Sequence, residues 1–216
     1  MKKRPGFGLY LVTDRALSLG RPLEEVVGVA MRGGVSAVQL REKSCSTKEY
    51  IDLARRMAHL VRLRRIPLII NDRLDVALAA GADGVHLGQN DMPYAEARKI
   101  LGPDAIIGLT VETMEEALAA ENLDVDYLGV SPIFPTPTKT DTKEPWGSER
   151  LRLLRARSRH VLIAIGGINA ANAAQVMAAG ADGIAVVSAI CSAPDPESAA
   201  RQLKGIVDSY QRKAAG

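Results

Sequence analysis

The sequence predicts a (β/α)8 barrel in a single domain that spans residues 1–216. Short apolar runs alternate strictly with longer amphipathic runs, eight of each, and this alternation indicates parallel strands joined by crossover helices. A helix-turn-strand unit also recurs: AAGADGVHLG at 79–88 and AAGADGIAVV at 178–187 are near copies, and MRGGVSAVQL at 31–40 is a looser one. Such a repeat favours a closed ring. The alternation by itself also fits a doubly wound open sheet.

The predicted elements follow from local pattern. The strands are short, rich in β-branched residues and bounded by Gly, Asp or Asn; they are 9–13, 37–41, 68–71, 84–87, 106–110, 127–130, 161–165 and 183–187. The helices carry apolar residues at three- and four-residue spacing; they are 23–32, 48–65, 74–80, 94–101, 113–121, 148–157, 170–179 and 197–211. In each copy of the repeat, a glycine at the helix end can adopt the left-handed conformation that stops a helix.

Composition narrows the function classes. The hydrophobic content of 47% in 216 residues is enough for one large core. The net charge of +3, with both signs interspersed, gives no basic patch for nucleic acid or a membrane surface. No apolar run approaches the roughly 20 residues of a membrane helix, and residues 1–8 are followed by no signal-peptide core. We therefore expect a cytoplasmic protein with Cys45 and Cys191 reduced, a single bridge between them being the alternative.

The exit of strand 37–41 carries a candidate anion site. Active sites of (β/α)8 barrels lie at the C-terminal ends of the strands. Because side chains alternate along a strand, Gln39, Arg41 and Lys43 share one face, and Leu40 and Glu42 take the other. Three donors, two of them cationic, suit an anion. The alternative is a surface salt-bridge cluster in which Glu42 neutralises a cation.

The next strand exits carry a candidate metal site. Asp72, preceded by Asn71, and Asp91 follow neighbouring strands at the same rim. Two carboxylates suit a Mg²⁺ ion that keeps several waters and meets substrate phosphates. The alternative is a pair of aspartates that are solvated or that cap the following helices. His86 is interpreted as a packed or hydrogen-bonded barrel side chain, and the Thr110 hydroxyl fits either a ligand contact or a helix cap.

The last strand exits favour phosphate binding. Gly166 and Gly167 follow strand 161–165, and Val187 and Ser188 end strand 183–187. Glycines let a ligand approach the backbone, and the loops after the seventh and eighth strands form the recurring phosphate site of this fold. The alternative is that these glycines only allow tight turns of the backbone. Since both loops carry suitable residue types together, phosphate binding is the better interpretation.

A long polar loop, IFPTPTKTDTKEPWG at 133–147, leaves the sixth strand beside this phosphate site. Thr136, Thr138 and Lys139 offer hydroxyls and an ammonium to an anion. Prolines restrict the loop, and its length allows it to cover the mouth of the barrel as a lid. The alternative is a surface insertion. Together, the rim residues indicate a metal-assisted transferase or isomerase that acts on phosphorylated substrates.

The motifs QLREK, ND, HLGQND, PIFPTPTK, AIGGI and VVSAI occur at successive strand exits over nearly the whole chain. As a set, the sequence resembles the thiamine-phosphate synthase family. The resemblance implies joining of 4-amino-2-methyl-5-hydroxymethylpyrimidine diphosphate to a thiazole phosphate, or its carboxylated form, with release of pyrophosphate. Its partners would be these small molecules alone, and its cofactor Mg²⁺. Both a monomer and a homodimer are compatible with the sequence.

The resemblance also implies residue roles. The pyrimidine diphosphate would bind the run 39–43, with Leu40 and Glu42 inside it, and Asn71, Thr110 and Lys139. Mg²⁺ would bind Asp72 and Asp91. The thiazole phosphate would bind Thr136, Thr138, Gly166, Gly167, Val187 and Ser188. The residues expected to act in catalysis are Arg41, Lys43, Thr110 and Lys139. The family usually has serine where this chain has Thr110, so the hydroxyl is kept and a methyl is added.

Three alternatives stay open at this point. A thiazole tautomerase of the same superfamily needs no metal or diphosphate site and often has histidine at the position of Glu112. A phosphosugar epimerase or aldolase on the same barrel needs a Schiff-base lysine or paired base carboxylates. A ligand-sensing regulator would bind without turnover. The intact diphosphate and metal motifs favour the synthase.

Overall fold

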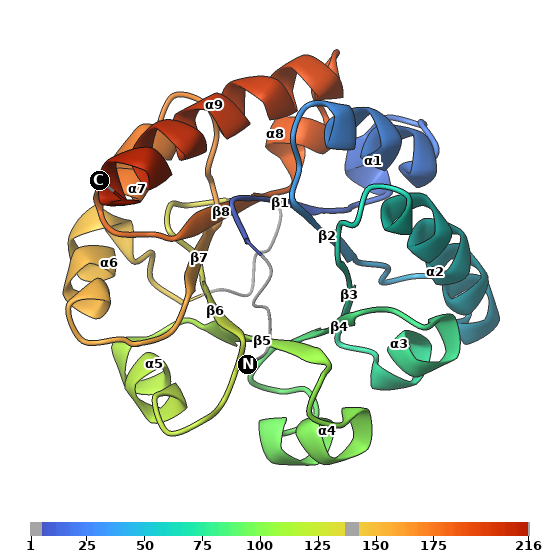
Figure 1. Ribbon diagram of the computed structural model, residues 1–216, viewed down its shortest axis with the longest axis horizontal. Helices are drawn as coiled ribbons and strands as arrows, with labels where there is room; N and C mark the ends of the chain where they lie inside the picture. Colours follow the sequence, from blue (N-terminus) through green and yellow to red (C-terminus); the bar gives the residue numbers. More distant parts are fainter. Residues whose placement is uncertain (1–5, 137–142, 216) are drawn as a thin grey trace.

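The computed structural model describes residues 6–136 and 143–215, which form a closed barrel of eight parallel strands (Figure 1). The strands pair in sequence order, and β1 closes the ring by pairing with β8. Their bounds are β1 Leu9–Val12, β2 Ala37–Leu40, β3 Leu68–Asn71, β4 Gly84–Leu87, β5 Ile106–Val111, β6 Tyr127–Val130, β7 Leu162–Ile165 and β8 Gly183–Val186. The predicted (β/α)8 barrel is confirmed, and the open sheet is excluded.

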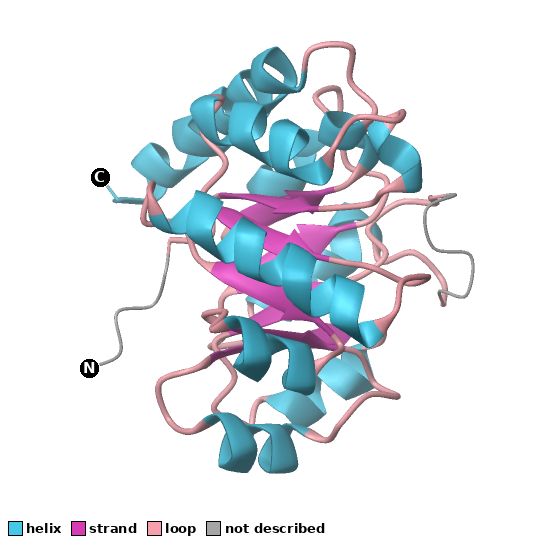
Figure 2. Ribbon diagram, turned by 90° about the vertical axis from the view of Figure 1, so that its right-hand side faces the viewer, coloured by secondary structure: helices cyan, strands magenta, loops and turns pink. Residues whose placement is uncertain are grey.

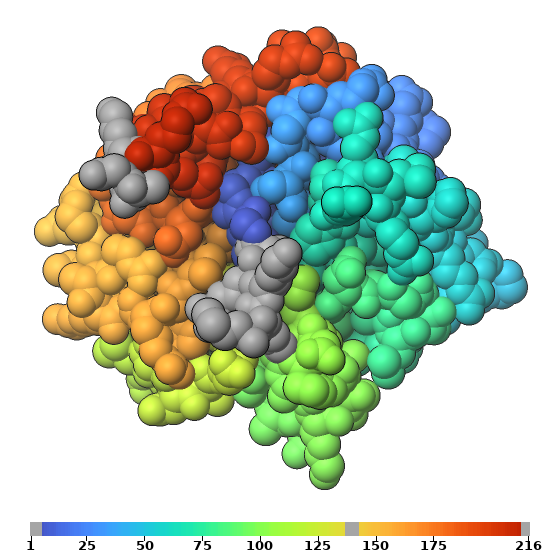
Figure 3. All heavy atoms as spheres, in the orientation of Figure 1, coloured from blue at the N-terminus to red at the C-terminus, as the bar shows by residue number. Residues whose placement is uncertain are grey.

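The helices form a ring around the strands. Their bounds are α1 Leu23–Arg32, α2 Thr47–Arg62, α3 Leu74–Ala80, α4 Tyr94–Leu101, α5 Met114–Ala120, α6 Gly147–Arg155, α7 Ala173–Ala178, α8 Ser188–Cys191 and α9 Pro196–Ala215, with a 3₁₀ turn, η1, at Ala16–Ser18. In the space-filling view the colours follow the sequence around the ring until α9 meets α1 (Figure 3). Within the described residues, no helix is both long and apolar enough to cross a bilayer.

Several element ends differ from the predicted bounds by up to four residues, and two differences have a clear structural cause. The strict alternation is broken by α8, a four-residue helix between β8 and α9 that is too short to show a periodic pattern. The predicted helix 170–179 begins later, at Ala173, because two asparagines hold a turn in front of it. Asn172 Oδ1 accepts from the Asn169 amide at 2.8 Å, and Asn169 Oδ1 accepts from the Ala171 amide at 2.9 Å.

The repeated glycines behave as predicted. Gly34, Gly81 and Gly180, one in each copy of the repeat, have φ values of 103°, 64° and 100° and lie between a helix and the following strand. This left-handed backbone favours glycine because it has no Cβ. Both cysteines are free thiols, with Cys191 buried and Cys45 partly exposed, so the alternative of a bridge between them is wrong.

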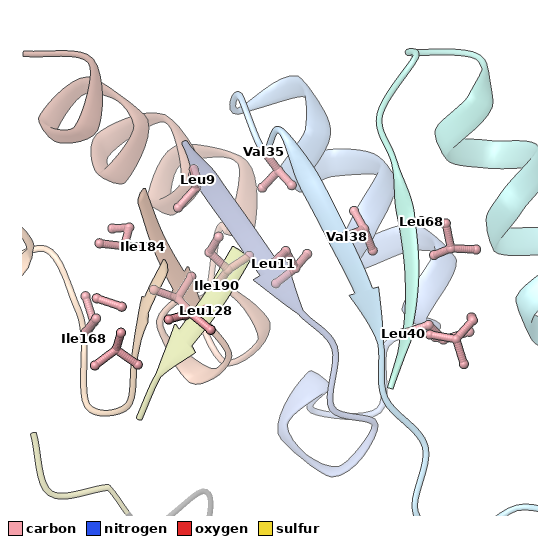
Figure 4. Close-up of a cluster of buried hydrophobic side chains, with 14 of the residues drawn as sticks. Leu9, Leu11, Val35, Val38, Leu40, Leu68, Leu128, Ile168, Ile184 and Ile190 are labelled. Atoms are coloured by element: carbon pink, nitrogen blue, oxygen red, sulfur yellow. The ribbon is translucent and has the colours of Figure 1, made fainter. Parts of the chain in front are cut away.

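The core has two layers because alternate strand residues face opposite sides of the sheet. The outer layer packs strand residues such as Leu11, Val38 and Leu68 against the helices (Figure 4). The inner layer fills the barrel with Phe7, Tyr10 and a few small or branched residues. All the strands point toward one end of the barrel, where the loops that follow them gather (Figure 2).

Candidate active site

A cavity of about 520 Å³ opens at the C-terminal ends of the strands, and every strand contributes to its lining. It brings together most of the residues predicted to form the site. Those that line it are Gln39, Arg41, Lys43, Asn71, Asp72, Asp91, Thr110, Thr136, Gly166, Gly167, Val187 and Ser188. Thr138 and Lys139 lie outside the described residues.

The side chains of two predicted residues lie away from the cavity. Leu40 is fully buried in the outer core layer near Leu68 (Figure 4). The Glu42 carboxylate turns outward to Arg15, with a distance of 3.2 Å between Oε2 and Nε. Both follow from strand alternation, which sends every second side chain away from the barrel axis. The predicted binding segment 39–43 therefore reaches the cavity through alternate side chains. Glu42 does neutralise a cation, as the alternative expected, but that cation is Arg15 and not one of the cavity residues.

The two predicted cations are each held by a carboxylate. Arg41 Nη1 lies 3.0 Å from Asp14 Oδ2, and the Arg41 amide donates to Thr13 Oγ1 at 3.1 Å. Lys43 Nζ lies 2.9 Å from Asp72 Oδ2. Sequence reasoning missed Asp14, although its position just after the first strand was the available signal. Since the Lys43 side chain is 58% exposed and that of Arg41 is 24% exposed, both can reach a bound anion.

Asp72 and Asp91 form a pair at the exits of β3 and β4. Asp72 has a φ of 63°, and its amide donates to the His86 carbonyl oxygen at 2.9 Å. Asp91 Oδ2 accepts from the Gly88 amide at 2.7 Å. Burial raises the pKa of Asp91, and the neighbouring Asp72 carboxylate raises it further. The N-caps of α3 and α4 are Arg73 and Pro93, so the alternative of two helix-capping aspartates is wrong.

This pair fits a magnesium ion. In the part of the chain that the structure describes, no group of three or more His, Cys, Asp or Glu side chains is placed to hold a metal. Mg²⁺ commonly takes one or two carboxylates and completes its shell with waters and substrate phosphates. The Asp72 carboxylate contributes to the raised pKa of Asp91, so two acidic groups converge here, and a bound divalent cation would offset their repulsion.

Replacing Asp91 by asparagine is expected to stabilise the metal-free protein at neutral pH. A raised carboxyl pKa means that the folded state binds the proton more tightly than the unfolded state, so ionised Asp91 costs folding free energy above that pKa. In EDTA at pH 7, Asp91→Asn should raise Tm by about 1–2 °C, and the difference should shrink as pH falls. Calorimetry at several pH values checks this. A lower Tm at pH 7 would show that the bond from Gly88 outweighs the repulsion.

The opposite side of the cavity is built from backbone. Gly166 and Gly167 have φ values of 102° and 66°. A Cβ on Gly167 would lie 2.8 Å from the Pro135 carbonyl oxygen, so the exits of β6 and β7 pack too closely for a side chain. The Phe134 amide donates to the Gly166 oxygen at 3.0 Å. This packing places Thr136 on the same cavity wall as the two glycines.

The described ends of the long loop are anchored at the cavity. The Trp146 amide donates to the Pro132 oxygen at 2.8 Å, and the Gly147 amide donates to the Ile133 oxygen at 3.0 Å. Lys143 lines the cavity and lies 2.6 Å from Glu116 Oε1 in the first turn of α5. Sequence reasoning missed both Lys143 and Glu116. Their 27-residue separation in sequence gave no local signal.

A family model described as thiamine monophosphate synthase matches residues 9–190 of this chain. The chain belongs to the thiamine-phosphate synthase family. A thiamine-phosphate synthase of Albidiferax ferrireducens is 54% identical over 201 residues, covering 93% of this chain and 92% of the relative. One of Leptospira biflexa is also 54% identical over 201 residues, covering 91% and 96%. A solved thiamine phosphate pyrophosphorylase from Pyrococcus furiosus superposes with a TM-score of 0.89 at 41% identity, covering 96% and 98%.

This member of the thiamine-phosphate synthase family carries a polar floor that sequence reasoning largely missed. His86 Nδ1 lies 3.0 Å from Tyr127 Oη, and His86 Nε2 lies 2.7 Å from Thr110 Oγ1. The interpretation of His86 as a hydrogen-bonded barrel histidine is confirmed. Thr110 is no helix cap, because Thr113 caps α5 by accepting from the Glu116 amide. Thr110 therefore lines the cavity and does not cap a helix.

Proposed function

We propose that this protein is a thiamine-phosphate synthase that needs Mg²⁺ and uses the cavity residues described above. It joins the aminopyrimidine diphosphate to the thiazole phosphate and releases pyrophosphate, as expected of a transferase in this family. One observation carries the residue assignment: a single cavity holds cations and paired carboxylates at β2–β4 and glycine-rich backbone at β7–β8. These are two chemically different anion sites, which suits two phosphorylated substrates.

The diphosphate is assigned to the β2–β4 side. Arg41 and Lys43 would exchange their present carboxylate partners for phosphate oxygens, and charge-assisted bonds of this kind are strong. Asp72 and Asp91 would hold Mg²⁺, which when bound supplies positive charge to the leaving pyrophosphate. Asn71 lies beside them on the cavity wall. Lys139, in the long loop, is assigned to the same diphosphate from the family resemblance.

The thiazole phosphate is assigned to the β7–β8 side. Gly166 and Gly167 leave the backbone open to a ligand, and Val187 and Ser188 follow on the neighbouring strand exit. Thr136 adds a hydroxyl from the loop after β6, and Thr138 is assigned there by resemblance alone. Phosphate at this position matches the recurring site of the fold.

The proposed reaction requires these residues to stabilise the negative charge that develops on the leaving pyrophosphate. We propose that pyrophosphate leaves first, giving a resonance-stabilised pyrimidine cation, and that the thiazole nitrogen then attacks it. Arg41 and Lys43 would stabilise the negative charge on the leaving group, and substrates that fill the cavity would keep water from the cation. The charged residues that line the cavity support early departure of pyrophosphate, because Arg41 and Lys43 lie on the side assigned to the diphosphate.

The tautomerase and the sensor are less well supported. A tautomerase would not need the cations Arg41 and Lys43 or the carboxylates Asp72 and Asp91. In addition, Glu112 lines the cavity at the position where such proteins often have histidine. We further propose a cytoplasmic location, which two free thiols support, and a monomer or a homodimer as the active form.

Turnover assays test the proposal. The purified protein is incubated with both substrates and Mg²⁺, and thiamine phosphate and pyrophosphate are followed by chromatography, with EDTA as the control. Equal amounts of the two products, lost in EDTA, are expected. Binding of either substrate without product would overturn the synthase assignment in favour of the tautomerase or the sensor.

A further inference from the structure

Five side chains cross the cavity floor as one hydrogen-bonded chain, here called the floor chain. In order from β2 to β5, they are Gln39, Tyr10, Tyr127, His86 and Thr110. The successive donor–acceptor distances are 3.2, 2.9, 3.0 and 2.7 Å. All five line the cavity; the two ends are predicted substrate-binding residues, and the three middle members come from β1, β6 and β4. The floor chain therefore connects two predicted substrate-binding residues through the barrel interior.

The middle of the floor chain is rigidly packed. The rings of Tyr10 and Tyr127 meet edge to face, and the rings of His86 and Tyr127 are stacked with centroids 5.4 Å apart. Glycines make the room: a Cβ on Gly108 would lie 2.1 Å from the Tyr127 ring, and one on Gly129 would lie 2.9 Å from the His86 ring. Burial also raises the phenol pKa of both tyrosines. They are therefore neutral hydroxyls, each with one proton to donate.

Counting protons gives the floor chain a direction. The Gln39 amide nitrogen donates to the Tyr10 oxygen. Within the described residues, Tyr127 is the one remaining partner for the proton of Tyr10, so Tyr10 donates to Tyr127. Tyr127 then donates to Nδ1 of His86. A reversed Tyr10–Tyr127 bond would leave the Tyr10 proton buried and unpaired, which is costly.

We propose that the floor chain holds His86 as its Nε2–H tautomer and so fixes Thr110 as a hydrogen-bond donor toward the bound diphosphate. This inference deepens the proposed function and rests on it. His86 Nε2–H occupies the oxygen of Thr110, and in the described part of the chain the Thr110 hydroxyl has no other side-chain or backbone partner. Its proton is left for an acceptor in the cavity. His86 and the two tyrosines are positioning residues, and Thr110 is the group that touches substrate.

The other end of the floor chain is oriented by the same bonds. Because the Gln39 nitrogen faces Tyr10, its Oε1 has no protein donor among the residues described and is left to accept from a ligand. An exocyclic amino group, such as that of an aminopyrimidine, is a donor of the right kind. A ligand seated on Gln39 thus stabilises the proton order that keeps Thr110 a donor. The floor chain would couple recognition of the pyrimidine to stabilisation of its leaving group.

The tautomer can be read without any substrate. In ¹⁵N-histidine-labelled protein, long-range nitrogen–proton correlation spectra are expected to show His86 with a protonated Nε2 and an unprotonated Nδ1. In the variant Tyr127→Phe, which keeps the ring but removes the donor, the Nδ1 signal should shift toward that of a nitrogen without a hydrogen bond. A protonated Nδ1 in the wild-type protein, whether as the other tautomer or as imidazolium, would overturn the proposed direction.

Kinetics then test the link to Thr110. Thr110→Val should lower kcat by about a hundredfold, in the range seen for loss of one oxyanion donor, and Tyr127→Phe by about tenfold. The double variant should be no slower than Thr110→Val, because Tyr127 acts only through Thr110. Tyr94→Phe is the matched control: its hydroxyl donates to the Asp124 oxygen outside the cavity, and normal kcat is expected.

The outcomes separate this inference from the proposed function. Multiplying effects in the double variant, or a Tyr127→Phe variant with normal kcat, would show that the floor chain only supports the fold. A wild-type protein without synthase activity would defeat the proposed function, and the spectra of the substrate-free protein would still decide the direction of the chain.

Discussion

Replacing Asp72 by asparagine is expected to lower kcat about a thousandfold and to leave the fold intact. The change removes one of the two carboxylates proposed to hold Mg²⁺, and loss of charge stabilisation on a leaving group costs roughly 4 kcal/mol of the barrier. Asparagine is the suitable replacement because Asp72 has a φ of 63°, a conformation that asparagine tolerates better than alanine. Steady-state assays over a range of Mg²⁺ concentrations measure the loss.

The matched control for this variant is Asp75→Asn. Asp75 lies three residues further on, at the start of α3, where its carboxylate pairs with Arg73 on the surface. Normal kcat and normal Mg²⁺ dependence are expected. If Asp72→Asn kept wild-type kcat at the same Mg²⁺ concentration, the metal assignment would be wrong, and the Lys43–Asp72 pair would be a simple salt bridge.

The fold was largely predictable because it rests on patterns within the chain. Three strands, at Leu68–Asn71, Gly84–Leu87 and Tyr127–Val130, match their predicted bounds, since a short, mostly apolar and buried run ends where a Gly, Asp or Ser follows. The short α8 was not predictable from periodicity, because four residues complete barely one turn. The late start of α7 depends on two asparagine side chains that can either cap a helix or hold a turn.

The rim of the site was predictable for a related reason. In a barrel of parallel strands, residues at successive strand exits must converge, so Arg41, Asp72 and Asp91 could be grouped without a structure. The floor could not be found in this way. Tyr10 and Tyr127 lie inside strands and look like core residues, and they meet across 117 residues of sequence. Only the closed ring shows that their hydroxyls pair.

Replacing Arg41 by alanine is expected to lower kcat/KM for the pyrimidine diphosphate by about a hundredfold to a thousandfold. Arg41 is half-buried at the exit of β2, and its guanidinium is oriented by Asp14 at 3.0 Å, so it is poised to take two phosphate oxygens at once. Arg41→Lys should recover only part of the loss, since an ammonium keeps the charge without the planar two-point geometry. Initial rates with each substrate varied in turn measure both variants.

The pattern across substrates decides whether the assignment is right. An anion contact on the pyrimidine side should leave KM for the thiazole phosphate nearly unchanged, whereas general damage to the barrel would raise both KM values. Arg56→Ala is the control, because Arg56 pairs with Glu24 on the outer surface, and wild-type kinetics are expected.

Asp14→Asn should give a smaller loss of kcat/KM than Arg41→Ala, because it loosens the Arg41 guanidinium without removing it. A larger loss would mean that Asp14 matters chiefly for the fold, since its carboxylate also accepts from the Leu17 amide at the start of η1.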